Sequence, residues 1–379
     1  MSKRWNRLIM FTVLCGGMMA GCLDPYTPPK SKGDSRFLVI DGVVNTTEGS
    51  ATVKISRAVS LDNEVLSDPV AGAAVQILDD ADAAVTLFAE DVGVYKAYFP
   101  FRSGSRYRVQ VDLDGKTYES EPATMVSNVP VDSLRYEAGE DALRVRVYAH
   151  DETGNGDRYF RYSYDATYEY RSPYASLYTF NGGVPEYREP GDDIYSCWTT
   201  RPSSRILLAS TEGLDRPVVA GLAIEEIPKG DKRLWFRYSL LVRQHALDEA
   251  AYLYWSRLKD VSQSLGGLFD PVPFSVQGNI RCVSDPDEQV LGYFSGGEVE
   301  EKRITIANTN LPLGYYQSGI GDCTESYVRI AELESIANRS VLLTRADYLG
   351  IFIIGYFYTS PVCGDCRFGG GTNQRPPFM

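Results

Sequence analysis

The sequence predicts a mainly β protein with two β-rich regions and one long helix. Most of the 379 residues fall in short runs that alternate apolar and polar side chains between Gly, Pro, Asn and Asp, a pattern typical of strands and tight turns. Tyr, which favours strands, occurs 26 times. Apolar residues recur at helical spacing over 248–265, where Asp248 is a good N-cap and the helix is expected to cover one face of a sheet.

The composition is that of an ordinary globular protein and argues against several functional classes. With 44% apolar and 23% charged residues, the chain is neither disordered nor fibrous. A formal net charge of −12 argues against a broad nucleic-acid-binding face. Two histidines in the whole chain leave little room for His-based catalysis or a His-rich metal site, and no cofactor or metal is indicated.

The N-terminus has the features of a lipoprotein signal peptide. Basic residues precede a short apolar stretch that ends in Met19-Ala20-Gly21-Cys22, and small residues before a cysteine are typical of the site where the leader is cut and the cysteine is lipidated. We therefore predict a signal peptide over 1–21, lipidation of Cys22 and a Pro-rich tether over 22–34. An ordinary signal peptide with a chance cysteine is the alternative. The prediction places the protein at the outer membrane of the cell envelope, lipid-anchored and exposed at the surface rather than facing the periplasm.

Residues 35–128 predict a β-sandwich domain of about seven short strands. Asp114-Gly115 between two of these strands is a strong hairpin signal. The order Pro69-Val70-Ala71-Gly72, then Gly93-Val94-Tyr95, then Tyr107-Arg108-Val109 resembles the prealbumin-like sandwich of carboxypeptidase-regulatory domains. The resemblance implies a sandwich of that kind at the N-terminus.

Val129-Pro130-Val131-Asp132 indicates a domain boundary, and 131–379 predicts a larger β-rich domain that carries the helix. Evenly spaced tyrosines in its first long strand would share one face. They could form an aromatic platform for a sugar, a peptide or a protein partner, whereas the favoured alternative is that they cover a sheet face. These candidate binding residues are Tyr162, Tyr164, Tyr168 and Tyr170.

Two later segments carry specific expectations. The run from Tyr348 to Phe357 is almost wholly apolar, so its strand is expected to be buried on both faces. The acidic loop with Asp285, Asp287 and Glu288 offers oxygen ligands for Ca²⁺, but it lacks the spacing of a known calcium loop and a plain turn is favoured.

Five cysteines follow the predicted lipidation site and are disulfide candidates in an oxidising envelope. Since five is an odd number, at least one thiol is free or pairs with another chain. Cys363-Gly-Asp-Cys366 could be a redox pair or half of a zinc site, but one or two bridges that fasten the C-terminal tail are favoured. The candidates are Cys197, Cys282, Cys323, Cys363 and Cys366.

The C-terminal half carries a series of motifs in a specific order. They are Ala251-Tyr252 with Trp255, Leu268-Phe269-Asp270-Pro271, Gly278-Asn279-Ile280, Asp285-Pro286, Val290-Leu291-Gly292-Tyr293-Phe294, Cys363-Gly-Asp-Cys366-Arg367 and Gly370-Gly371-Thr372-Asn373. With the N-terminal signal and the sandwich, this order resembles the DUF4249 family of Bacteroidota envelope lipoproteins over essentially the whole mature chain. The last residue, Met379, departs from the aromatic that often ends such chains.

The resemblance implies a gene neighbour that encodes a TonB-dependent outer-membrane transporter, but it implies no activity and no catalytic residues. Asp132-Ser133-Leu134 also matches the short sequence that is O-glycosylated in Bacteroidota envelopes, which makes Ser133 a candidate glycosylation site.

The sequence therefore predicts an outer-membrane lipoprotein that is accessory to a TonB-dependent transporter and is not an enzyme. It would bind a nutrient ligand, dock on the barrel, or both, with the bilayer and the transporter as its partners. A structural or adhesive surface lipoprotein is the alternative. An envelope hydrolase fits less well, because the sequence lacks Gly-x-Ser-x-Gly and His-Glu-x-x-His motifs, and His150 and His245 are expected to be surface or packed residues.

Overall fold

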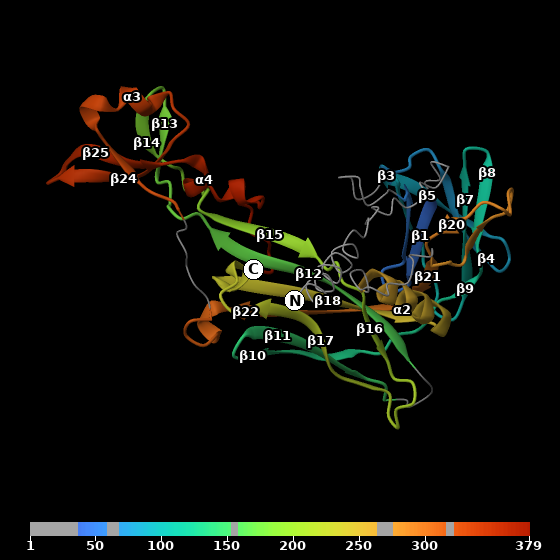
Figure 1. Ribbon diagram of the computed structural model, residues 1–379. Helices are drawn as coiled ribbons and strands as arrows, with labels where there is room; N and C mark the ends of the chain where they lie inside the picture. The colour runs from blue at the N-terminus through green and yellow to red at the C-terminus, as the bar shows by residue number, and fades with distance from the viewer. Residues whose placement is uncertain (1–36, 59–67, 153–157, 264–275, 316–321) are drawn as a thin grey trace, which may run out of the picture. The chain divides into compact units, whose positions relative to one another are not determined.

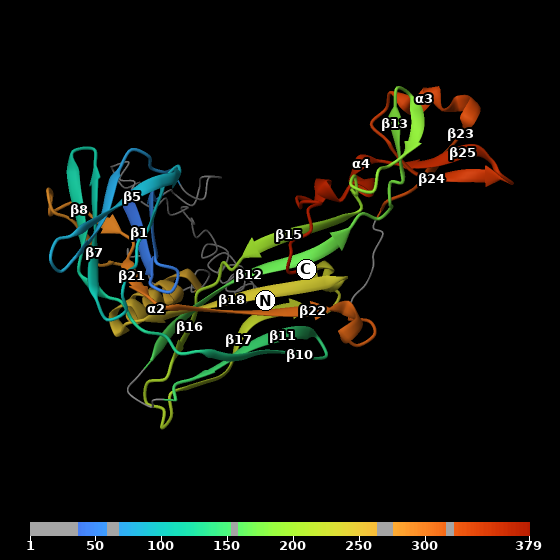
Figure 2. The same ribbon diagram turned by 180° about the vertical axis from the view of Figure 1, so that it is seen from behind.

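The computed structural model describes residues 37–58, 68–152, 158–263, 276–315 and 322–379. The strands form four sheets, which confirms the mainly β fold that the sequence predicts (Figures 1 and 2). No helix within these ranges has the length and apolar character needed to cross a membrane. The predicted signal peptide, Cys22 and the tether lie outside the described residues.

The first sheet forms a sandwich around one apolar core. Its strands follow the order β19-β8-β7-β4-β5-β6-β2-β1-β20, with β21 also beside β1, β3 beside β2 and β9 beside β7. Ile40 and Val44 of β1 and Val53 and Ile55 of β2 are buried in this core, and the residues between them point outward. The bounds are β1 (Leu38–Asn45), β2 (Ser50–Arg57), β3 (Asp68–Pro69), β4 (Ala74–Asp79), β5 (Ala84–Asp91), β6 (Val94–Tyr98), β7 (Arg106–Leu113), β8 (Lys116–Ser120), β9 (Ala123–Thr124), β19 (Ile280–Cys282), β20 (Val290–Leu291) and β21 (Phe294–Gly297).

The turn between β7 and β8 follows the local signal. Asp114 and Gly115 have φ angles of 51° and 75°, so both lie in the left-handed region that this type of two-residue hairpin turn requires. The Asp-Gly hairpin predicted from the sequence is therefore present.

The segment from β19 to β21 returns from the second half of the chain to complete this first sandwich. β19 pairs antiparallel with β8, and β20 and β21 pair parallel with β1. The predicted assignment of all residues after 131 to one domain needs correction here, because these strands fill edges of the first sheet. Pairing between segments so distant in the sequence leaves no local signal.

A second sandwich packs a three-stranded sheet, β10-β11-β17, against a five-stranded sheet, β15-β12-β18-β22, in which β16 also pairs with β12. Residues of both sheets share one apolar core, to which β11 contributes Leu143, Val145 and Val147, and β18 contributes Leu240 and Val242. The bounds are β10 (Val131–Ala138), β11 (Ala142–His150), β12 (Tyr159–Arg171), β15 (Ser196–Pro202), β16 (Leu207–Ser210), β17 (Val218–Pro228), β18 (Arg237–Leu247) and β22 (Val299–Ala307).

The predicted long helix is present as α2 (Glu249–Gln263). The side chain of Asp248 accepts a hydrogen bond of 2.8 Å from the backbone N–H of Ala251, which confirms Asp248 as the N-cap. The helix contacts β12, β16 and β18, and Tyr254 stacks on Tyr293, which lies between β20 and β21, at 4.5 Å between ring centroids. Helix α2 therefore touches both sandwiches.

The fourth sheet has the order β14-β13-β24-β25-β23 and a small core of its own. The prediction that the run from Tyr348 to Phe357 is buried on both faces is wrong. Leu349, Ile351 and Phe352 are 70%, 87% and 71% exposed, because the run forms the end of the β24–β25 hairpin rather than a central strand. The remaining bounds are β13 (Tyr178–Asn181), β14 (Val184–Tyr187), β23 (Ser326–Arg329), α3 (Glu334–Ala337), β24 (Leu342–Leu349), β25 (Phe352–Thr359) and α4 (Pro361–Gly364).

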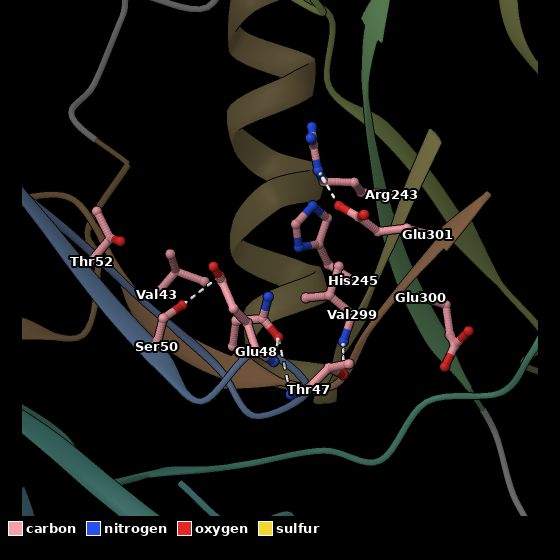
Figure 3. A pocket seen from close by; sticks show the side chains of 11 residues that line it. Val43, Thr47, Glu48, Ser50, Thr52, Arg243, His245, Val299, Glu300 and Glu301 are labelled. Atoms are coloured by element: carbon pink, nitrogen blue, oxygen red, sulfur yellow. Dashed lines mark hydrogen bonds and ion pairs between the residues drawn. The ribbon is translucent and has the colours of Figure 1, made fainter. Parts of the chain in front are cut away.

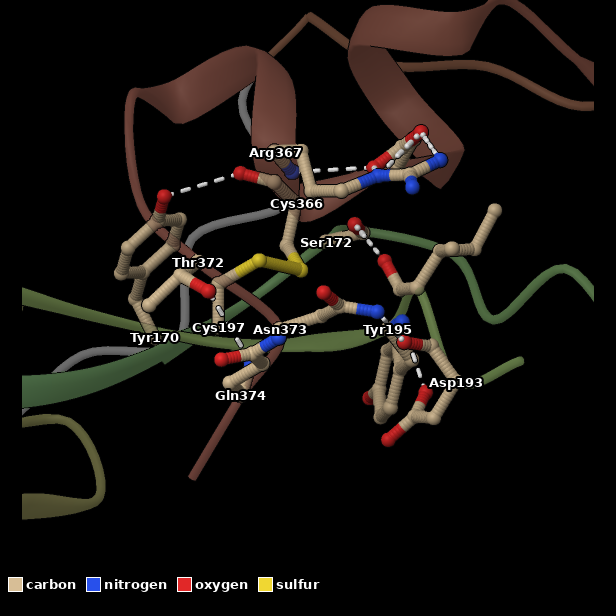
Figure 4. The surroundings of a disulfide bond; sticks show 12 residues. Tyr170, Ser172, Asp193, Tyr195, Cys197, Cys366, Arg367, Thr372, Asn373 and Gln374 are labelled. Carbon is tan, nitrogen blue, oxygen red and sulfur yellow. Dashed lines mark hydrogen bonds and ion pairs between the residues drawn. A yellow bond between two sulfur atoms is a disulfide. The ribbon is translucent and has the colours of Figure 1, made fainter. Parts of the chain in front are cut away.

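Two disulfides, Cys197–Cys366 and Cys323–Cys363, fasten the C-terminal segment, and Cys282 is a buried free thiol. Cys363 and Cys366 each bridge to a different strand or loop, so the interpretation of this motif as a redox pair is wrong. Figure 4 shows the first bridge, beside which the hydroxyl of Tyr170 donates a 2.8 Å hydrogen bond to the carbonyl of Cys366.

A close backbone contact joins the two sandwiches where β21 leads into β22. The carbonyl of Gly297 accepts a hydrogen bond from the N–H of Thr46, and one residue later the carbonyl of Glu298 accepts one from Ala246. A Cβ atom on Gly297 would lie 2.6 Å from the carbonyl oxygen of Val126 and 3.1 Å from that of Ala246. Only a glycine fits this position without moving backbone.

We predict that Gly297→Ala lowers the free energy of unfolding by about 2 kcal/mol, because the added methyl group overpacks two backbone carbonyls. Urea denaturation would measure the change. Gly191→Ala is the matched control: no atom lies within 4 Å of its added Cβ, and its effect should stay below about 0.5 kcal/mol. Equal stability of the two variants would contradict the close contact.

Candidate functional site

The outward face of the β1–β2 hairpin and the outward face of β12, β18 and β22 line a cleft between the sandwiches. Alternate residues of β1 and β2 point away from the first core, among them Asp41, Val43, Thr52 and Lys54. On β12, β18 and β22 the alternate residues form cross-strand rows, such as Arg161 opposite His245 and Ser163 opposite Arg243. We call this space the β1–β18 cleft. Val43 contacts every part of it.

The outer end of the cleft is an open cavity of about 610 Å³ with charges of both signs. Figure 3 shows Glu48 and Ser50 on one side and Arg243, His245 and Glu301 on the other. Arg243 is fully engaged: its Nε donates to Glu301 at 2.7 Å and its Nη1 contacts Asp165 at 2.8 Å. The hydroxyl of Ser50 donates to Glu48 at 2.8 Å. Carboxylates and hydroxyls at this density suit the hydroxyl or amide groups of a polar ligand.

The inner end of the cleft is a smaller cavity of about 230 Å³, lined by Asp41, Lys54, Arg161, Trp255 and Tyr293 among others. The guanidinium of Arg161 lies 4.5 Å above the ring of Trp255, a cation–π contact that connects β12 to α2. Burial lowers the pKa of Arg161. Asp41 is an exposed residue, but desolvation of its carboxyl by the surrounding residues raises its pKa, against the opposing effects of a backbone hydrogen bond and of the charges of Lys54 and Arg161.

His245 lies between the two ends of the cleft and contacts Ser163, with 2.9 Å between Nε2 and the hydroxyl oxygen. This pair resembles a nucleophile and its base. However, burial, together with the charges of Arg161 and Arg243, lowers the pKa of His245 to about 3, so the imidazole is a weak base at neutral pH. Its Nδ1 has no hydrogen-bond partner among the described residues, so no carboxylate orients the ring as in a catalytic triad. The arrangement suits binding rather than acyl transfer.

The predicted aromatic platform is not exposed, and the alternative interpretation is correct. Tyr162, Tyr164 and Tyr168 are buried in the core of the second sandwich, and Tyr170 is half-buried against it. Their even spacing does place them on one face of β12, but that face points inward. Their hydroxyls are used internally: that of Tyr162 donates to Gln244 at 2.6 Å, and that of Tyr164 donates to Glu225.

The acidic loop, Ser133 and His150 lie outside the β1–β18 cleft. The acidic loop is a turn closed by Lys116, whose Nζ lies 2.9 Å from Asp285 and 2.6 Å from Glu288. Ser133 is a half-buried residue of β10, and its glycosylation stays a prediction. His150 lies at the surface, where its Nδ1 contacts Asp132 at 2.7 Å.

Sequence reasoning missed Arg161, Lys54 and Asp41 as site residues. A signal was present, because polar side chains at Arg161, Ser163 and Asp165 alternate with the tyrosines of the same strand. The prediction from the sequence concerned only the tyrosine face of this strand and not its polar face. Trp255 of α2 also belongs to the site, because its ring contacts both Arg161 and the cavity.

Comparison with known proteins matches one family model and many solved structures, of which two are described here. The model of the family described as "Domain of unknown function (DUF4249)" matches residues 24–303. A proposed carbohydrate-binding protein from Bacteroides uniformis aligns with 12% identity over 57% of this chain and 91% of its own, at a TM-score of 0.14. A DUF3823 family protein from Parabacteroides merdae aligns with 8% identity over 55% and 89%, also at 0.14. Scores this low carry no functional argument. No curated protein matches the chain.

We predict that the pKa of His150 lies above the ordinary value for histidine and that the pKa of His245 lies below it. The hydrogen bond to Asp132 raises the pKa of His150, so this pair stabilises the fold below about pH 6.5 and the contribution is lost as the pH rises through the raised pKa. The pKa of His245 is about 3 in the folded protein, whereas an unfolded His binds a proton below about pH 6.5. The unfolded state therefore gains this proton and the folded state does not, so the free energy of unfolding decreases as the pH falls below about 6.5.

NMR titration of the imidazole signals would measure both values. Asp132→Asn should return His150 toward its ordinary pKa and leave His245 unchanged, which makes His245 the internal control. A pKa near 6.5 for His245 would mean that water reaches its ring freely.

Proposed function

This chain belongs to the DUF4249 family, whose description assigns no activity. We propose, from the β1–β18 cleft and the exposed end of the β24–β25 hairpin, that it is a non-catalytic envelope lipoprotein. It would capture a small polar nutrient for a TonB-dependent outer-membrane transporter. The β1–β18 cleft carries this proposal. It combines carboxylates, a free guanidinium, hydroxyls and a tryptophan in two cavities that share Val43 and Thr52. Such a set recognises ligands rich in hydroxyl or amide groups.

Binding rather than turnover fits the chemistry of the cleft. The Ser163–His245 pair lacks a base of suitable pKa, and Arg243 is neutralised by Asp165 and Glu301. A ligand would therefore meet fixed hydrogen-bonding groups and no activated nucleophile. Asp and Glu pairs of this cleft serve as acceptors for ligand hydroxyls.

The proposed docking surface is the end of the β24–β25 hairpin. Tyr348, Leu349, Ile351 and Phe352 are all more than half exposed, and no charged residue occurs from Tyr348 to Phe357. A contiguous exposed apolar surface of this kind is typical of contacts with other proteins or with membranes. We assign it to the transporter, which the family resemblance implies as the neighbouring partner. The predicted lipid on Cys22 would hold both proteins in the same membrane.

We predict that Val43→Trp strongly weakens ligand binding, because Val43 lines both cavities of the cleft and an indole there would obstruct each of them. Isothermal titration against a panel of oligosaccharides and short peptides would identify a ligand of the native protein and measure the loss, expected to exceed about tenfold in Kd. Val92→Trp makes the same substitution at an exposed site outside the cleft and should retain binding. Binding that survives Val43→Trp would place the ligand elsewhere, and a wild-type protein that binds nothing in the panel would contradict a capture role.

We predict that a TonB-dependent barrel co-purifies with the protein from native outer membranes and that Phe352→Glu removes it, since a charge would be buried at an apolar contact. Mass spectrometry of the purified complex would measure this. Leu313→Glu is the control, because Leu313 is 94% exposed and lies outside the hairpin. If no barrel protein accompanies the wild type, the docking role fails. A deletion strain that grows on every nutrient but no longer attaches to surfaces would favour the adhesive alternative.

A further inference from the structure

We propose that the inner end of the β1–β18 cleft is an anion subsite in which Arg161 binds a carboxylate of the ligand. The inference rests on the proposed function and deepens it, because it names the charged group that the captured ligand carries. The subsite is the cavity of about 230 Å³ lined by Arg161, Lys54, Asp41, Trp255 and Tyr293.

Arg161 is a half-buried arginine without an acceptor. Within the described residues it makes no hydrogen bond and no ion pair, and its one assigned contact is the ring of Trp255. Arg243, one rung away on β18, differs because two carboxylates bind it. Desolvating a guanidinium without supplying an acceptor is unfavourable. A ligand with an oxyanion would supply this acceptor, and the resulting hydrogen bonds would favour its binding.

Two of the three nitrogens of Arg161 are open to solvent. Nε is sealed from solvent without a partner, whereas Nη1 and Nη2 are not sealed and have no partner among the described residues. Arg161 lines the inner cavity, so these two nitrogens are the ones that a ligand can reach. Two neighbouring N–H groups of one guanidinium match the two oxygens of a carboxylate. The stacking on Trp255 holds the guanidinium plane in place before the ligand arrives.

The charge balance directs an anion to this end of the cleft. Asp41 and Lys54 lie directly opposite each other on β1 and β2, so Lys54 offsets the charge of Asp41, the carboxylate that acts on Arg161. The outer end carries Glu48, Glu300 and Glu301 around the already paired Arg243. An anion is therefore attracted to the inner end and repelled from the outer one. The ligand would lie with its carboxylate against Arg161 and its uncharged hydroxyl or amide groups toward the outer carboxylates.

The group that fits Arg161 is a carboxylate on a small polar ligand. A uronic-acid oligosaccharide or the C-terminus of a short peptide can supply it. Two pairs of probes separate these sources from each other and from binding that needs no carboxylate. Trigalacturonic acid is compared with its methyl ester, and trialanine with its C-terminal amide. Each pair differs in the charge while most of the shape is kept.

The experiment titrates the full-length protein with the four probes and follows both the heat of binding and the NMR signal of the Trp255 indole N–H, assigned with Trp255→Phe. We expect an acid to bind and to move this signal, and its ester or amide, which lacks the carboxylate, to bind at least about tenfold more weakly. Arg161→Gln should abolish that preference. Arg135→Gln is the matched control, since Arg135 lies over the ring of Tyr148 at 4.9 Å but outside the cleft, and it should retain the preference.

The outcomes distinguish the two levels of the proposal. If the ester or the amide binds as tightly as its acid, or if Arg161→Gln keeps the preference for the acid, the subsite is overturned while capture in the cleft stands. If the acids bind without moving the Trp255 signal, the anion lies elsewhere and the subsite is likewise overturned. If the protein binds neither these probes nor any member of the wider ligand panel, the capture function itself fails. Preference for one acid over the other identifies the sugar or the peptide as the source of the carboxylate.

Discussion

The close packing of backbone at Gly296-Gly297 is the constraint on which the arrangement of the two sandwiches depends. β21 pairs with β1 of the first sandwich, and a few residues later the same run, as β22, pairs with β18 of the second. A Cβ on Gly296 would lie 2.8 Å from the carbonyl oxygen of Val44, so the chain passes this point with backbone against backbone. Because one continuous segment belongs to both sheets, the outward face of β1 is brought opposite the outward faces of β18 and β22. The cleft is a consequence of this connection.

The period of two along each strand then divides the side chains between core and cleft. On β12, Tyr162 and Tyr164 enter the core, while Arg161 and Ser163 between them face the cleft. The same alternation separates Val44 from Val43 on β1. A shift of one residue in either strand would exchange the two sets and place an arginine in an apolar core. The register that builds the hydrophobic core therefore also builds the binding surface.

Local features of the fold could be predicted from the sequence, and features that depend on distant partners could not. The Asp114-Gly115 turn and the Asp248 cap each depend on a few neighbouring residues, and both occur as expected. The returning strands and the disulfide partners join segments far apart in the chain, which no local pattern encodes. The apolar run that ends β24 shows a different failure: hydrophobicity alone does not state whether a strand is central or projects as a hairpin. The alternation on β12 indicates a polar face that includes Arg161. That Arg161 has no acceptor depends on its tertiary surroundings and could not be predicted.

The unpaired polar atoms of the cleft lower the stability of the folded protein, which indicates that these side chains are not there for stability. Arg161 Nε, His245 Nδ1 and Trp255 Nε1 are all sealed from solvent without partners in the described part of the chain, and they belong to neighbouring residues of one site. Each such atom destabilises the fold by about 1–3 kcal/mol relative to a satisfied one. Apolar side chains at these three positions would remove the cost and would still fill the space between β12, β18 and α2. A polar cluster that weakens the folded state is expected where its charge and donors serve a ligand, and the open Nη groups of Arg161 show where the oxygen atoms of that ligand would lie.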